Sequence, residues 1–251
     1  MTTRTHLGTQ PLWDVAIERA MDGAMTGAVN GGAQRFRLDV AFQSDAKRLV
    51  LFGPSGAGKS LTLMAIAGLI RPDAGHVRLQ GRTLFDARVC VKPRERALGY
   101  LFQDYALFPH LTVRQNIGFG LVHGMRNPGK RIDDARVGEW LATLELDTLA
   151  DRYPDQLSGG QRQRTALARA LIGEPRALLL DEPFAALDGP LRRRLREDLL
   201  ALQARLALPM ILITHDESDV EMFGDCVVAI DAGRVVEITD ACTNARERAL
   251  P

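Results

Sequence analysis

The segment Gly53-Pro-Ser-Gly-Ala-Gly-Lys-Ser60 limits what this chain can fold into more than any other part of its sequence. It fits the pattern G-x-x-x-x-G-K-[ST] and stands between an apolar run, 49–52, and a helical pattern, 61–69. Glycines let successive backbone N–H groups turn toward phosphate oxygens, and the start of a helix adds its positive end. A glycine turn with an incidental lysine is the alternative, but the flanking strand and helix favour a nucleotide site.

Each position of this loop has an expected part in that site. Lys59 is expected to neutralise charge on the β- and γ-phosphates, and the hydroxyl of Ser60 to bind Mg²⁺. The rest of the cradle consists of Gly53, Pro54, Ser55, Gly56, Ala57 and Gly58. The loop therefore predicts ATP or a related nucleotide with Mg²⁺, and it does not distinguish between classes of NTPase.

Two adjacent acids end a second apolar run, Leu178-Leu-Leu-Asp181-Glu182-Pro183. A parallel strand buried on both faces is apolar throughout, and ligands of open α/β sheets bind beyond the carboxyl ends of the strands. We expect Asp181 to hold Mg²⁺ through water and Glu182, which points elsewhere, to polarise the attacking water. Acids after a strand more often cap a helix, and only the phosphate loop upstream reverses that interpretation.

The sequence Leu157-Ser158-Gly159-Gly160-Gln161 opens a predicted helix and forms a second candidate anion-binding turn. A plain N-cap serine followed by a glycine turn is the alternative. One chain does not need two such turns for one triphosphate. Two chains arranged head to tail would need both, because each turn could close on the nucleotide held by the other chain.

The apolar patterns indicate a single α/β domain, for which 251 residues provide a full core. Residues 1–34 are poorly defined, with a possible edge strand over 14–18, and the domain is expected over 35–251. Residues 104–171 are mainly helical and predict a helical subdomain. A helix is also expected over 191–208, with a solvated face rather than a nucleic-acid patch formed by the charges Arg192–Arg194, Arg196, Glu197 and Asp198. Strands are expected near 36–42, 76–79, 99–102, 177–180, 210–214 and 227–230.

Composition indicates a cytoplasmic chain without a nucleic-acid partner. The formal net charge of +1 gives no large field to attract a polyanion. No apolar run approaches the roughly 20 residues that span a bilayer, and no secretory pattern opens the sequence. The three cysteines, Cys90, Cys226 and Cys242, lack metal-ligand spacing and indicate free thiols in a reducing compartment. Any membrane connection must therefore run through a partner.

Taken together, these motifs resemble those of ATP-binding cassette (ABC) ATPases over residues 36–236. The resemblance implies an α/β fold: a P-loop NTPase cassette with a RecA-like core, a helical subdomain and an N-terminal antiparallel β region. It also implies that Gln103 contacts Mg²⁺ and the attacking water, and that His215 holds the γ-phosphate and orients Glu182. Asp188 would link the two sites of a dimer. The turn that binds the opposing subunit's ATP would comprise Ser158, Gly159, Gly160 and Gln161.

The same resemblance implies partners. The cassettes would form a homodimer on membrane permease subunits at the inner face of the cell membrane, with a substrate-binding protein in the same system. The apolar segment 104–113 would receive a permease helix, with Tyr105, Leu107 and Phe108 as docking candidates. The alternative for each of these three side chains is packing inside the subdomain's own core.

The segments 81–87, 92–96 and 99–110, together with 36–42, most resemble the ATPases of molybdate importers. Sulfate/thiosulfate, iron and polyamine importers have closely similar cassettes. Since the sequence stops at Pro251, we expect no C-terminal oxyanion-binding regulatory domain. An exporter ATPase, a soluble ABC ATPase and a degenerate nucleotide sensor are the rival interpretations. The apolar loop after Gln103 favours an importer.

The adenine contact departs from the family pattern. Family members usually stack adenine on an aromatic side chain near the first strands. The corresponding region here holds Met21 within 20–33 and has no Tyr or Trp. Phe36 follows in a predicted strand, and Trp13 is expected to be a core or edge residue. We therefore expect weak discrimination between ATP and GTP.

Overall fold

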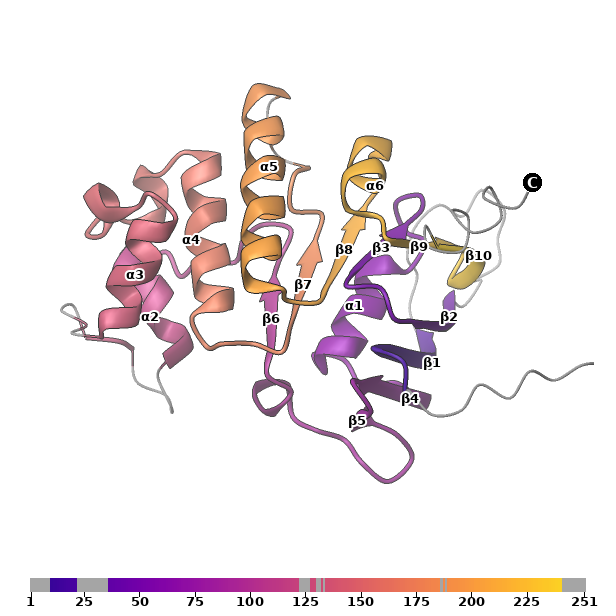
Figure 1. Cartoon of the computed structure of the whole chain (residues 1–251). Helices are drawn as coiled ribbons and strands as arrows, with labels where there is room; N and C mark the ends of the chain where they lie inside the picture. Colours follow the sequence, from indigo (N-terminus) through magenta and orange to yellow (C-terminus); the bar gives the residue numbers. More distant parts are fainter. Residues whose placement is uncertain are drawn as a thin grey trace, which may run out of the picture.

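A computed structural model of the chain describes residues 10–21, 36–121, 127–129, 132, 134–185, 187 and 189–240. These residues form a ten-stranded mixed sheet with helices packed against both faces (Figure 1). The strand order is β5-β4-β1-β2-β10-β9-β3-β8-β7-β6. Within the described ranges, no helix is both long and apolar enough to cross a bilayer.

Five neighbouring strands at one end of the sheet run parallel. Alternate residues of β7 belong to different buried clusters: Leu178 and Leu180 pack on one face, and Leu179 on the other. Because both faces are covered, the run is apolar throughout, as the sequence analysis expected. The strands are β3 (Arg48–Phe52), β6 (Leu98–Leu101), β7 (Ala177–Asp181), β8 (Met210–Thr214) and β9 (Cys226–Asp231).

At the other end of the sheet four strands pair antiparallel: β1 (Trp13–Met21), β2 (Phe36–Ser44), β4 (Ala74–Leu79) and β5 (Arg82–Phe85). Strand β10 (Arg234–Asp240) lies between β2 and β9, parallel to β2 and antiparallel to β9. The strand expected over 14–18 is present within β1, but its expected position at the sheet edge is wrong, because β1 pairs with β2 on one side and β4 on the other. Trp13 is fully buried, which makes it a core residue. Strands β5 and β10 were not predicted; β5 has only four residues, and β10 exposes most of its side chains.

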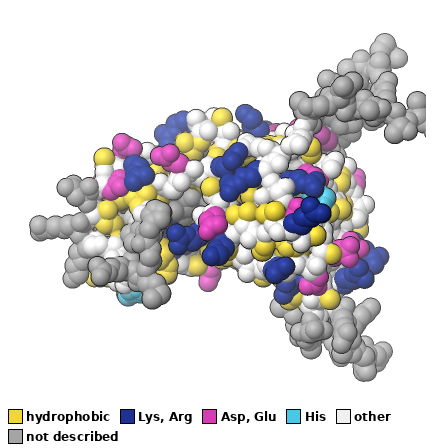
Figure 2. Space-filling view, turned by 90° about the horizontal axis from the view of Figure 1, so that it is seen from below, with side chains coloured by type: hydrophobic (Ala, Val, Ile, Leu, Met, Phe, Trp, Pro, Cys, Tyr) yellow, Lys and Arg dark blue, Asp and Glu magenta, His cyan; other side chains and the backbone are white. Residues whose placement is uncertain are grey.

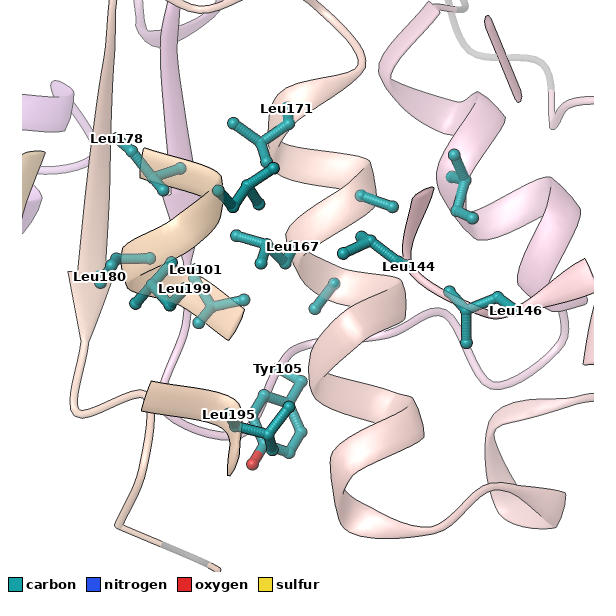
Figure 3. Packing of buried hydrophobic residues seen from close by; sticks show 14 of the residues in the cluster. Leu101, Tyr105, Leu144, Leu146, Leu167, Leu171, Leu178, Leu180, Leu195 and Leu199 are labelled. Atoms are coloured by element: carbon teal, nitrogen blue, oxygen red, sulfur yellow. The ribbon is translucent and has the colours of Figure 1, made fainter. Parts of the chain in front are cut away.

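Helices cover the two faces differently. Helix α1 packs in the cluster that holds Leu179, whereas α4 and α5 pack in the cluster that holds Leu178 and Leu180 (Figure 3). Helices α2, α3 and α4 lie together at one flank (Figure 1), and we propose that they form the subdomain expected over 104–171. The helices are α1 (Lys59–Ala67), α2 (Val113–Gly118), α3 (Ala135–Thr143), α4 (Gly159–Leu171), α5 (Gly189–Leu206) and α6 (Glu217–Phe223). Short 3₁₀ turns are η1 (Pro93–Glu95), η2 (Phe119–Leu121), η3 (Asp147–Leu149) and η4 (Pro154–Gln156).

The charged residues of α5 differ from expectation. Arg193 and Arg194 are exposed, as a solvated helix face requires. For Arg192 and Arg196 that interpretation is wrong, since both are partly buried and hydrogen-bond to acids near the start of α6. The sequence of α5 alone could not indicate this pairing, because the two acids, Asp216 and Asp219, lie in a later segment of the chain, after β8.

Charges of both signs are interspersed with apolar side chains on the face seen in Figure 2. This distribution agrees with a formal net charge of +1. The face therefore presents no extended region of a single sign.

Candidate active site

The phosphate loop joins β3 to α1 through a backbone that only glycine accommodates at two points. Gly53 has φ +149° and Gly58 has φ +103°. A Cβ at Gly53 would come within 2.1 Å of the carbonyl oxygen of Ile230, and one at Gly58 within 2.8 Å of Leu38 Cδ1. Pro54, Ser55 and Gly56 are exposed, while Ala57, Gly58 and Lys59 are buried.

Lys59 is held inside this loop. Its Nζ donates hydrogen bonds to the carbonyl oxygens of Gly53 at 2.7 Å and Pro54 at 2.8 Å. Burial lowers the pKa of Lys59, and the nearby charges of Glu182 and Asp181 oppose that shift. The ammonium group therefore lies beside the N–H cradle, in partly desolvated surroundings where its attraction for phosphate is strengthened.

Asp181 closes on the loop from the end of β7. Its Oδ1 accepts a hydrogen bond from Ser60 Oγ at 2.9 Å, and its Oδ2 one from the hydroxyl of Tyr100 at 3.4 Å. Burial raises the pKa of Asp181. Sequence reasoning missed Tyr100, whose position opposite β7 follows only from the pairing of β6 with β7.

The oxygen donors at this point fit Mg²⁺. A hydroxyl and a carboxylate are hard ligands, and Mg²⁺ commonly takes one or two protein oxygens together with substrate phosphates. Among the described residues there is no group of three or more His, Cys, Asp or Glu side chains able to hold a metal. Ser60 and Asp181 are the residues that would hold the ion.

Glu182 is directed away from Asp181 by a left-handed backbone, with φ +45°. Its Oε2 lies 3.3 Å from Nδ1 of His215, which follows β8. Its backbone N–H donates to the carbonyl oxygen of Ile213 at 3.2 Å. The two adjacent acids thus have separate partners: Asp181 contacts the phosphate loop, and Glu182 contacts the histidine.

Gln103 lies exposed in the turn after β6. Among the described residues, its side chain makes no hydrogen bond to Ser60 or Asp181. Asp188 lies outside the described residues. The structure therefore brings together Lys59, Ser60, Asp181, Glu182 and His215.

The turn at Ser158 starts α4 with a capping box. Ser158 Oγ accepts from the N–H of Gln161 at 3.3 Å, and Gln161 Oε1 accepts from the N–H of Ser158 at 2.9 Å. A Cβ at Gly160 would approach Leu191 of α5 to 3.0 Å, so the helix start packs closely on α5. Helix α4, which the Ser158 turn opens, packs on the sheet face opposite to α1, which the phosphate loop opens. Strand β3, which leads into the phosphate loop, is separated from the edge strand β6 by β8 and β7. The two candidate anion-binding turns thus belong to opposite faces of one sheet.

Phe36 lies beside the phosphate loop. It pairs with Met21 across β1 and β2, and its Cζ would lie 3.1 Å from a Cβ at Gly58 and 3.2 Å from one at Gly233. The ring is only partly buried. Apart from Ala20 and Met21, the segment expected to hold the base contact lies outside the described residues.

The docking candidates differ from one another. Tyr105 is 5% exposed and packs in the cluster with α4 and α5 (Figure 3), so its prediction as a docking residue is wrong. Leu107 is half-buried against the same cluster. Phe108 is half-buried and lines a groove of about 510 Å³ between β6 and the end of α4. The guanidinium carbon of Arg169 lies 5.4 Å from the centre of its ring.

A family model described as ABC transporter matches residues 38–185. The chain belongs to the ABC transporter family. Two solved dimeric structures of the ATP-binding cassette MJ0796 match it, one of them in a post-hydrolysis state bound to ADP and Pi. The TM-scores are 0.71 and 0.72 at 27% and 26% identity, covering 91% of this chain and 97% and 98% of the matched chains. This chain is an ATP-binding cassette of the kind that couples ATP hydrolysis to transport.

Curated relatives in this family are import ATPases. A "Probable sulfate/thiosulfate import ATP-binding protein CysA" of Chlorella vulgaris is 45% identical over 76% of this chain and 78% of its own length. Sulfate/thiosulfate import ATP-binding proteins CysA of Bradyrhizobium diazoefficiens and Bordetella bronchiseptica are 50% and 46% identical. They are matched over 76% and 82% of this chain, which spans only 55% and 58% of their own lengths.

Proposed function

We propose that this cassette hydrolyses MgATP at two sites, each shared between two copies of the chain, as the ATPase subunit of an importer. The observation that carries the shared site is the placement of the phosphate loop and the Ser158 turn on opposite faces of one sheet. A second copy in head-to-tail orientation would supply the turn that the first cannot direct to its own loop. The dimeric structures of the matched cassette support this arrangement.

The described side chains divide the reaction between them. Lys59 exchanges its carbonyl partners for the β- and γ-phosphate oxygens. Ser60 and Asp181 would hold Mg²⁺, which would supply charge neutralisation at the phosphates. Glu182 accepts a proton from the attacking water. At the same time the water oxygen bonds to the γ-phosphorus, and the bond between that phosphorus and the ADP oxygen breaks. In its doubly protonated form, His215 donates from Nδ1 to Glu182 and from Nε2 to a γ-phosphate oxygen.

Phe36 supplies the base contact in this proposal. Stacking on an aromatic face contributes about 1–3 kcal/mol per base and hardly distinguishes between bases. We expect Phe36→Ala to raise the KM for ATP and for GTP by a similar factor, about 10-fold, measured by phosphate release. Phe36→Leu, which keeps packing against the loop glycines, controls for collapse of the loop. A strong preference of the unmodified protein for ATP would show that another residue reads the base.

In this proposal a permease helix docks in the groove that Phe108 lines. We expect Phe108→Glu to abolish co-purification with the permease from membranes. The carboxylate would pair with Arg169 and remove the apolar contact, so the fold should tolerate it. Val236→Glu is the matched control, because Val236 is 64% exposed on β10, away from the groove. Retention of the permease by Phe108→Glu, with Val236→Glu behaving identically, would contradict docking at this groove.

For the substrate we propose an oxyanion. The names of the relatives favour sulfate or thiosulfate over the molybdate that the sequence resemblance suggested. The side chains of this cassette face nucleotide rather than cargo, so recognition belongs to the permease and binding protein. Uptake of radiolabelled sulfate compared with molybdate, in cells lacking this chain, distinguishes the two. In that system the cassette would sit at the inner face of the membrane, bound to the permease.

A further inference from the structure

The guanidinium group of Arg196 on α5 joins two acids of the turn that follows His215. Its Nε donates to Asp219 Oδ1 at 2.5 Å, and one terminal nitrogen donates to Asp216 Oδ2 at 2.7 Å. The side chain of Arg196 is 12% exposed and that of Asp219 is 4% exposed. This fork is therefore mostly shielded from water, where a charged hydrogen bond is stronger than at the surface.

The same two acids fix the backbone on both sides of His215. The hydroxyl of Thr214 donates to Asp219 Oδ2 at 2.5 Å. The oxygen of the same hydroxyl accepts a hydrogen bond from the N–H of Asp216 at 3.0 Å. The imidazole of His215 is 56% exposed and has little packing of its own. Its direction is therefore set by the backbone at 214–216, which this network holds.

Arg196 also reaches the loop that carries Glu182. Its guanidinium carbon lies 5.7 Å from the ring centre of Phe184, two residues after Glu182, and this ring stacks on Phe223 at 5.9 Å. One turn earlier on α5, Arg192 donates to the carbonyl oxygen of Leu187 at 2.9 Å and to Asp216 at 3.4 Å. Helix α5 thus touches both loops whose side chains form the Glu182–His215 pair.

We propose that Arg196 is a positioning residue: it holds the His215 turn against the Glu182 loop so that Nδ1 of the histidine faces the carboxylate. The inference rests on the proposed ATPase function, because the groups that Arg196 would align are the ones that activate water in that reaction. A misplacement of about 1 Å in such a pair costs roughly 100-fold in rate.

Fold stability alone does not account for this arrangement. Replacing a buried ion pair by apolar side chains of similar volume is often neutral or stabilising, since desolvation offsets the attraction. What an apolar side chain cannot reproduce is the planar fork that fixes two carboxylates at once. Lysine would keep the charge and lose that geometry, so Arg196→Lys separates positioning from charge.

The chain offers a matched control. Arg164 on α4 also bridges two acids, with one terminal nitrogen 2.7 Å from Glu145 and the other 2.8 Å from Asp198. Its side chain is 15% exposed, close to the 12% of Arg196. None of the described residues of the phosphate loop, the Glu182 loop or the His215 turn bonds to it. Its acids are more exposed than Asp219, Glu145 at 65% and Asp198 at 44%, so Arg164→Lys removes a two-acid fork that is less shielded from water and lies away from the site.

We expect Arg196→Lys to lower kcat for ATP hydrolysis about 10- to 100-fold with KM changed by less than about twofold. Arg164→Lys should leave kcat within about twofold and, because Glu145 and Asp198 are more exposed than Asp219, should lower the urea midpoint no more than Arg196→Lys does. If Arg196→Lys fails to fold, Asp219→Asn, which keeps the shape and the Thr214 contact, is expected to give the same split. A kcat for the folded variant within about twofold of the unmodified protein, or an equal loss in Arg164→Lys, overturns the proposal.

The ring signal of His215 provides a readout that does not depend on turnover. In ¹⁵N-labelled protein, with His215→Gln identifying the signal, we expect Arg196→Lys to shift or broaden the His215 Nδ1 resonance and Arg164→Lys to leave it in place. An unchanged resonance in Arg196→Lys contradicts positioning. If the unmodified protein shows no MgATP hydrolysis, the proposed function fails, while this resonance still decides whether Arg196 holds the histidine.

Discussion

Replacing Glu182 by Gln is expected to lower kcat for ATP hydrolysis by about 10²- to 10⁴-fold while ATP remains bound. The amide cannot take the proton of the attacking water, yet it keeps the size of the carboxylate and can still face Nδ1 of His215. Because hydrolysis is what reopens the closed dimer in this account, the variant should accumulate with ATP as a dimer. Single-turnover measurement of phosphate release, with bound nucleotide counted after rapid filtration, checks both statements.

Glu217 provides the matched control for that variant. It lies exposed in the first turn of α6, two residues after His215, so Glu217→Gln removes a nearby carboxylate outside the pair. Its turnover should stay close to that of the unmodified protein. Normal turnover by Glu182→Gln would exclude the carboxylate as the general base.

Replacing Lys59 by Met is expected to raise the Kd for ATP about 100-fold, which corresponds to roughly 3 kcal/mol of lost charged hydrogen bonding. Methionine retains the buried aliphatic part of the lysine side chain. The carbonyl oxygens of Gly53 and Pro54 lose their hydrogen bonds from Lys59 Nζ, which bound phosphate would also take from them. Titration with a fluorescent ATP analogue measures the change.

Lys47→Met is the control for net charge, since Lys47 is exposed just before β3. The two variants carry the same formal charge, so any difference between them reports the position of the ammonium group. A Kd for Lys59→Met within about threefold of that for Lys47→Met would mean that the loop binds phosphate through its backbone alone.

Local sequence predicted the parts of the site that depend on local structure. The turn at 53–58 follows from its glycines, and the separation of Asp181 from Glu182 follows from their adjacency at a strand end. Helix α5 and the buried runs of β7 and β8 follow from apolar spacing.

Contacts between distant segments could not be predicted in the same way. Tyr100 reaches Asp181 only because β6 pairs with β7, and Arg196 reaches Asp219 only because α5 packs beside α6. Strand β1, which begins at Trp13, is interior to the sheet because β4, some sixty residues later, pairs with its second edge. The direction of the Tyr105 side chain could not be predicted from sequence either. Tyr105 lies in a turn, has φ +63° and is buried in the core.

The claim that each site is shared between two chains is tested most directly by the mass of Glu182→Gln in MgATP, with and without Ser158→Asp. Aspartate caps a helix as well as serine does, so α4 should persist, while its charge would repel an incoming phosphate. Light scattering after size exclusion should show a doubled mass for Glu182→Gln with ATP and a single-chain mass for the double variant. The double variant should still bind ATP as a monomer, with a Kd within about twofold. If it instead pairs normally, or if its monomer loses ATP, the Ser158 turn does not act across a dimer interface.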